Sequence, residues 1–124
     1  MIPGTVNARC EAVVQLRVRG PSGAEQDLDA VIDTGFPASL TLPAATTVAA
    51  LGLVLQSGGR AGLGDGSVRQ FEIYSAEVEW DGNWRIVLVW ALGDEVLIGM
   101  SLLAGHALRI DVVPGGAVEI APLP

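Results

Sequence analysis

The triplet Asp33-Thr34-Gly35 is the part of this chain whose residue types and spacing are best suited to chemistry. The β-branched pair Val31-Ile32 leads into it, and a second apolar run, Leu40-Thr41-Leu42, follows it. This pattern predicts a carboxylate carried out of a buried strand into a tight glycine turn, where an acid is costly unless it is paired or functional. One chain supplies one such acid. Two copies related by a two-fold axis would supply a close pair, which suits acid–base catalysis.

The same triplet is also compatible with an ordinary turn that does no chemistry, because aspartate and glycine are both favoured in turns. The apolar runs on its two sides favour the catalytic interpretation over the plain turn.

A second short motif, Leu97-Ile98-Gly99, reads as an apolar strand that ends at a glycine. Taken alone, this pattern is typical of a core strand. A glycine at its end would let another backbone segment or a side chain approach closely.

The glycine-rich segment Ser57–Gly66 continues into Ser67, and its densest part is Gly62-Leu63-Gly64-Asp65-Gly66-Ser67. It does not predict a phosphate-binding loop, because a strand rather than a helix follows it and the chain contains no lysine. Glycines permit positive φ angles and easy opening, so the segment is interpreted as the mobile tip of a hairpin. A plain surface loop is the alternative.

Two residues that often carry chemistry occur once each. His106 has no Gly-x-Ser-x-Gly partner motif for a catalytic triad, and one histidine with scattered acids does not predict a metal site, so we expect it at a helix end or on the surface. Cys10 rules out an intramolecular disulfide and a cysteine metal cluster, and it is expected to be structural. The sequence therefore predicts no cofactor.

The elements that must position these residues are mostly strands. Two short helices are expected, one over Ala44–Leu51 after Pro43, and one capped by Ser101 and running through His106. The turn Asp81-Gly82 predicts a hairpin that carries the three tryptophans as packing or interface residues. The predicted strands are Ala12–Arg19, Gln26–Ile32, Leu40–Leu42, Ser67–Trp80, Trp84–Ala91, Val96–Ile98, Ala107–Val113 and Ala117–Ile120.

Length and charge limit the classes of partner. A chain of 124 residues predicts a single domain, 1–124, and a net charge of −7 argues against nucleic acid and an acidic membrane surface as partners. Charged residues are only 17% of the chain, which favours burial of apolar surface in an oligomer. The N-terminus lacks a signal-peptide pattern, and the longest strongly apolar run, Ile86–Leu92, is too short to span a bilayer. A cytoplasmic location is expected.

Three motifs in this order resemble the retropepsin-like (clan AA) aspartic proteases, and most of all the small stand-alone bacterial type. Val31–Gly35 is similar to the catalytic loop of that family, and Gly64–Ser67 falls at the flap tip. Leu97–Leu103 is similar to the late apolar-apolar-Gly motif with its short helix, and Leu108–Asp111 to the strand after it. The resemblance covers about residues 12–120.

The resemblance implies an all-β, retropepsin-like acid protease half-barrel with one or two short helices and a flap hairpin. It implies an aspartic endopeptidase, active as a homodimer on peptide or protein substrates, in which the two copies of Asp33 share one proton. Thr34 would brace the loop across the dimer, and Gly35 would let backbone and substrate come close. The implied substrate-binding residues are Phe36, Leu63, Gly64, Asp65, Gly66, Ile98 and Gly99.

The chain departs from viral members of that family, which usually carry Ala or Ser where Phe36-Pro37 begins, and its glycine-rich flap is longer. The pair Phe36-Pro37 is similar to the bacterial branch. Two other functions stay open from sequence. One is a catalytically silent module of the same fold, used for dimerisation or peptide binding, and the other is a small-ligand β-barrel if the chain is monomeric.

Overall fold

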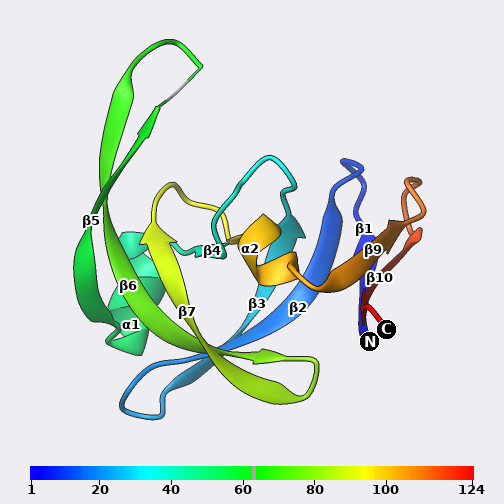
Figure 1. Cartoon of the computed structure of the whole chain (residues 1–124), viewed down its shortest axis with the longest axis horizontal. Coiled ribbons are helices and arrows are strands. Elements are labelled where there is room, and N and C mark those ends of the chain that lie inside the picture. The colour runs from blue at the N-terminus through cyan, green and yellow to red at the C-terminus, as the bar shows by residue number, and fades with distance from the viewer. Residues whose placement is uncertain (63) are drawn as a thin grey trace.

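The computed structural model describes residues 1–62 and 64–124, and this part of the chain is mostly β-strand (Figure 1). Its helical segments are short: η1 (Ala44–Val48), α1 (Ala49–Leu51) and α2 (Met100–Leu103). The strands are β1 (Ile2–Val6), β2 (Ala12–Arg19), β3 (Glu25–Ile32), β4 (Leu40–Thr41), β5 (Val54–Gly62), β6 (Val68–Trp80), β7 (Asn83–Ala91), β8 (Leu97–Ile98), β9 (His106–Ile110) and β10 (Ala117–Pro122). The predicted all-β class with short helices is confirmed.

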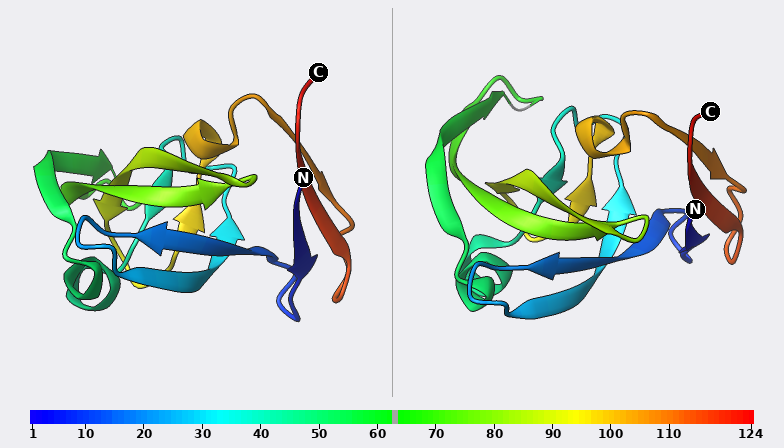
Figure 2. Two further views of the ribbon diagram at one scale, coloured as in Figure 1. Left: turned by 90° about the horizontal axis from the view of Figure 1, so that it is seen from below. Right: turned by 60° about the horizontal axis from the view of Figure 1, so that its bottom comes forward.

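Six of the strands close into a barrel. They follow one another in the order β6-β7-β4-β8-β3-β2, and β2 pairs with β6 to complete the ring. At one end of the sheet β1, β10 and β9 continue outward from β2, and at the other end β5 pairs with β6 alone (Figure 2). The chain therefore has a barrel body, a layer of terminal strands on one side and a long β5–β6 hairpin on the other.

Alternating apolar residues fill the barrel. On β2, Ala12, Val14, Leu16 and Val18 are all buried, while the residues between them are half-buried or exposed. This period of two places one face of the strand against the core. The core is continuous with residues of β4, β6, β7 and β8, so the short strand β8 is held from several directions.

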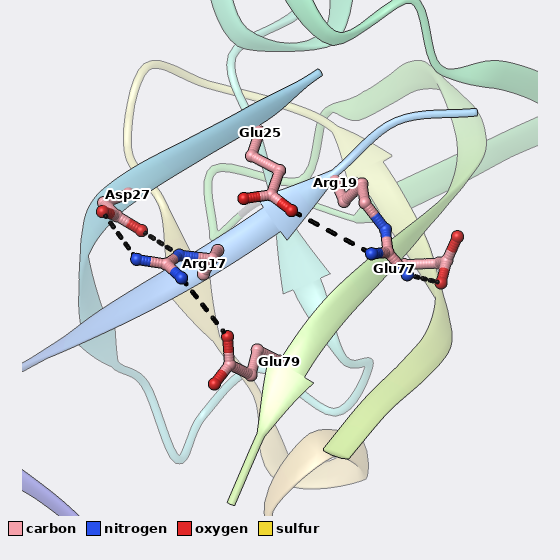
Figure 3. A network of polar contacts seen from close by, with 6 residues as sticks. All are labelled: Arg17, Arg19, Glu25, Asp27, Glu77 and Glu79. Atoms are coloured by element: carbon pink, nitrogen blue, oxygen red, sulfur yellow. Dashed lines mark hydrogen bonds and ion pairs between the residues drawn. The ribbon is translucent and has the colours of Figure 1, made fainter. Parts of the chain in front are cut away.

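The closing seam between β2 and β6 carries arginines flanked by acids on both neighbouring strands (Figure 3). Arg17 pairs with Asp27 at 2.8 Å and with Glu79 at 3.8 Å. The hydrogen bond to Arg17 holds the pKa of Asp27 below its usual range and raises the pKa of Arg17. These pairs sit on the outer face of the barrel, opposite the apolar interior.

Arg19 occupies the next outward position on the same seam. It pairs with Glu77 at 2.7 Å and with Glu25 at 4.0 Å, and its guanidinium lies 3.8 Å from the ring centre of Trp84. The planar guanidinium suits both contacts, because it forms ion pairs in its plane and stacks on an aromatic face.

The hairpin of β6 and β7 is confirmed, and so is its turn. Asp81 and Gly82 both have positive φ angles, 50° and 85°, as a two-residue hairpin turn requires. The predicted helix over Ala44–Leu51 is present as η1 followed by α1, and it ends at Gly52 with a left-handed φ of 61°.

Several sequence expectations are wrong. The N-terminal strand β1 was not predicted, since Pro3 and Gly4 are poor strand formers. Gly4 is nonetheless required there, because a Cβ would lie 2.3 Å from the carbonyl oxygen of Val13. The glycine-rich residues up to Gly62 form part of β5 and are not a loop. These residues have weak strand propensity, and they form a strand because they pair with β6.

The helix predicted from Ser101 to His106 is also wrong. α2 begins at Met100 after Gly99 and ends at Leu103, and His106 is the first residue of β9. Cys10 is exposed with a positive φ of 59°, so the expected structural role does not hold. No helix among the described residues has the length and apolar character needed to cross a membrane.

Candidate functional site

Asp33 lies directly after β3, in a turn that its own backbone and side chain stabilise. Its N–H donates to the carbonyl oxygen of Ile98 at 2.9 Å, and its carbonyl oxygen accepts from the N–H of Phe36 at 3.1 Å. The N–H of Gly35 donates to Oδ1 of Asp33 at 2.9 Å. Asp33 is half-buried, and Thr34 and Gly35 are exposed. The turn thus presents a carboxylate with one oxygen held by the backbone.

The position of the turn follows from the pairing of β8 with two strands. β8 runs parallel to β3 and antiparallel to β4, with Ile98 opposite both Ile32 and Leu40. The chain leaves β3, forms the Asp33 turn and returns as β4 on the other side of β8. This arrangement places Asp33 beside Gly99, where β8 ends.

Gly99 allows the loop 36–39 to lie against the start of α2. A Cβ on Gly99 would come within 2.1 Å of the carbonyl oxygen of Ala38 and 2.6 Å of that of Phe36. The N–H of Gly99 donates to the carbonyl oxygen of Ser39 at 3.0 Å. The close approach predicted for this glycine is therefore confirmed.

Two polar anchors of this loop were not identified from the sequence. Ser101 Oγ donates to the carbonyl oxygen of Pro37 at 2.6 Å, whereas the sequence had assigned Ser101 to a helix cap. Thr41 is only 2% exposed, and its hydroxyl donates to the carbonyl oxygen of Glu95 and accepts from the N–H of Leu97. A polar residue inside the Leu-Thr-Leu run was the signal that could have pointed to Thr41.

Three of the residues that were expected to bind substrate are buried next to the Asp33 turn. Phe36 is 8% exposed and Ile98 is fully buried, and Gly99 is buried too. The ring of Phe36 packs edge-on against Trp90, with 5.1 Å between ring centres. Their buried positions give these residues a role in shaping the Asp33 turn.

The segment predicted as a flap tip connects β5 to β6. Gly64, Asp65 and Gly66 are exposed, and Gly66 has a positive φ of 86°, while Leu63 lies outside the described residues. Oδ1 of Asp65 accepts from Oγ of Ser67 at 2.6 Å and from its N–H at 2.9 Å. These two bonds lower the pKa of Asp65. The β5–β6 hairpin projects from the same end of the barrel at which β3 ends (Figures 1 and 2).

Two hollows lie near these elements. One of about 380 Å³ is lined by Asp33 and Thr34 together with Cys10, Glu11, Ala12, Val31, Ile32, Glu95, Leu97, Ile110 and Val112. The other, of about 690 Å³, lies on the hairpin and is lined by Gly58, Gly59, Arg60, Gln70, Phe71 and Glu72. The structure thus places Asp33 beside one hollow and the hairpin's paired strands beside another.

The chemistry open to this site is that of a carboxylate. With one oxygen held by the Gly35 N–H, the other is left to accept a proton from water or to donate one when protonated. Within the part of the chain that the structure describes, no three histidine, cysteine or acidic side chains are grouped so as to hold a metal ion.

Comparison with known proteins adds no assignment. The chain matches no protein-family model and no curated protein. Its function is therefore argued from the motifs and the geometry above.

Proposed function

We propose that this chain is an aspartic endopeptidase of the retropepsin-like type, active as a cytoplasmic homodimer. The observation that carries the proposal is the Asp33 turn: a carboxylate at the end of a parallel strand pair, bound through one oxygen to the Gly35 N–H and flanked by exposed Thr34 and Gly35. The order of its motifs along the chain, from the Asp33 turn through the hairpin to Gly99, agrees with the resemblance noted in the sequence.

In this proposal the two copies of Asp33 meet at a two-fold axis and share one proton, because two like charges at close range do not both ionise. The ionised carboxylate takes a proton from water, and the water oxygen bonds to the carbonyl carbon of the peptide. The protonated carboxyl donates a hydrogen bond to the carbonyl oxygen. The C–N bond then breaks, and the leaving nitrogen receives a proton to give a free amine and a carboxylic acid.

The exposure of Thr34 and Gly35 supports the dimer, since it leaves the turn open to a second copy. The β5–β6 hairpin stands at the same end of the barrel and would cover a bound peptide, excluding water from the reaction. This hairpin carries the glycine-rich segment and the polar tip that the proposed flap would use.

The test is cleavage of a diverse peptide library by the purified protein at several acidic to neutral pH values. Asp33→Asn is expected to abolish cleavage while the protein stays folded, because the amide has nearly the same shape but does not act as the ionised base. Asp29→Asn is the matched control. Asp29 lies on the same strand, is exposed, and accepts a hydrogen bond from Gln15, so this variant should cleave like the wild type.

Cleavage by Asp33→Asn at the wild-type rate would refute the assignment. Peptide binding without cleavage by the wild type would instead identify the silent module of the same fold, and Asp33→Asn would then bind as the wild type does.

A further inference from the structure

Three aromatic rings connect the Asp33 turn to the β5–β6 hairpin. Phe36, three residues after Asp33, meets Trp90 edge-on with ring centres 5.1 Å apart. Phe71 of β6 stacks on Trp90 with ring centres 4.5 Å apart and an interplanar angle of 30°. Trp90 of β7 therefore touches both the turn that carries the carboxylate and the strand that leads to the hairpin tip.

Each outer ring of this stack packs against a glycine. A Cβ on Gly99 would lie 2.6 Å from Cδ2 of Phe36, and a Cβ on Gly59 would lie 2.7 Å from Cζ of Phe71. Neither ring could keep its place beside a larger residue. Gly59 belongs to the glycine-rich segment, so at this position the glycine serves packing as well as backbone freedom.

Trp90 itself is held by its backbone on two sides. It lies opposite Thr41 of β4 and opposite Ile73 of β6, and its carbonyl oxygen accepts from the N–H of Leu42 at 3.1 Å. Phe36 and Phe71 are each 8% exposed. The backbone of Trp90 is thus fixed to the barrel, its side chain is half-buried, and the two outer rings are buried.

We propose that Trp90 is a positioning residue that sets the β5–β6 hairpin at a fixed place relative to the Asp33 carboxylate. The expected effect on catalysis rests on the proposed function. The packing contact between the hairpin and the turn does not depend on that function. The hairpin pairs through β6 with β7 and β2, and these strands reach the Asp33 turn through their own pairing with β4, which follows the turn, and with β3, which precedes it. The aromatic stack adds a direct side-chain contact between the hairpin and the turn.

The consequence for catalysis is geometric. A peptide held between the hairpin and Asp33 reacts only if its carbonyl lies at the right distance from the carboxylates, and a misplacement of about 1 Å can cost about 100-fold in rate. Removal of the central ring should free the hairpin from the turn and lower kcat, without removing a group that touches the reacting atoms.

The experiment compares Trp90→Leu with Trp90→Phe and with the control Val87→Ala. Val87 lies three residues before Trp90 on the same strand and belongs to the hydrophobic core cluster, which does not include the three rings. For each variant, thermal stability, amide hydrogen exchange at residues 57–60 and 68–72, and kcat and KM for a cleaved peptide are measured.

We expect Trp90→Leu to speed exchange in the hairpin by about tenfold or more over the control at matched stability. We also expect it to lower kcat by about tenfold or more, with a smaller change in KM. Trp90→Phe should keep hairpin exchange and kcat close to the wild-type values, because it retains an aromatic ring. Val87→Ala should lower stability and leave hairpin exchange and kcat near wild type.

Equal hairpin exchange in Trp90→Leu and Val87→Ala would overturn the proposal, because the stack would then be ordinary packing. Should Trp90→Leu fail to fold, Phe36→Leu takes its place, since it removes the ring contact with Trp90 on the turn side and leaves every residue of the hairpin unchanged. If the wild type cleaves no peptide, the proposed function fails, whereas the exchange measurement still decides whether Trp90 couples the hairpin to the turn.

Discussion

At the scale of single residues, the Asp33 carboxylate depends on backbone contacts more than on side chains. The N–H groups of Asp33, Gly35 and Phe36 all have partners within the turn or on β8. The loop that follows is fixed by carbonyl groups packed against Gly99 and hydrogen-bonded to residues 99–101. Because so many of these partners are main-chain atoms, the sensitive positions are those where a new Cβ would collide with backbone.

Gly99→Ala is expected to be strongly destabilising for this reason. Its Cβ would meet two carbonyl oxygens at 2.1 and 2.6 Å, and neither belongs to a flexible side chain that could swing away. Strain of this kind costs about 3 kcal/mol or more in unfolding free energy, and the displaced loop should lower peptide cleavage with it. Urea unfolding and a cleavage assay measure the two effects.

Gly62→Ala is the matched control, because no atom of the described residues lies within 4 Å of its Cβ position and it has no left-handed φ. Its unfolding free energy should stay within about 0.5 kcal/mol of wild type. Equal unfolding free energies of the two variants would show that the backbone around Gly99 accommodates a Cβ.

Sequence patterns predicted part of this site at the residue level. The acid, its glycine turn and the close approach at Gly99 follow from the apolar runs that flank Asp33-Thr34-Gly35 and from a glycine placed at the end of an apolar strand. The burial of Phe36 and Ile98 and the bonds of Thr41 and Ser101 did not follow. They depend on which strands flank β8, and a single strand's pattern does not carry that information.

At the scale of elements, the hairpin tip depends on the ionisation of Asp65. Its carboxylate accepts from the hydroxyl and the N–H of Ser67, and these bonds lower its pKa. A carboxyl whose pKa is lower in the folded turn than in the open chain stabilises the turn above its ordinary pKa. That stabilisation is lost as the pH falls through the lowered value.

We therefore expect the Ser67 amide to report a titration in acid, with a midpoint below the usual range of an aspartate. Its NMR chemical shift and exchange rate against pH provide the measurement. Asp65→Asn is the control, since its amide oxygen accepts the same bonds and does not titrate. A Ser67 shift in Asp65→Asn that titrates like the wild type would contradict this assignment.

The elements themselves were predicted unevenly. β2 and the β6–β7 hairpin follow from alternation and from Asp81-Gly82. β1 and the glycine-rich half of β5 have weak strand propensity, and they form because neighbouring strands pair with them. Long-range pairing of this kind overrides local preference, so local patterns did not predict a strand in either segment.

At the scale of the whole molecule, the barrel is closed by a seam with charges outside and apolar residues inside. Val18 faces Val78 across β2 and β6, and Arg17 and Arg19 lie opposite Glu79 and Glu77 on either side of it. The closed barrel leaves the Asp33 turn at one end, with a single carboxylate of this kind per chain. The proposed chemistry therefore requires a second copy of the chain to supply the other carboxylate.

Mixing wild type with Asp33→Asn tests that requirement directly. If each active site takes one Asp33 from each copy, random exchange of equal amounts makes half of the wild-type chains partners of an inactive copy, and activity per wild-type chain falls to about half. The amounts are mixed above the dissociation midpoint found by sedimentation, and cleavage is followed until exchange is complete. Asp29→Asn in place of Asp33→Asn should leave the activity per chain unchanged. Activity per wild-type chain that stays constant with Asp33→Asn present would mean that each chain works alone, and the shared carboxylate pair would have to be abandoned.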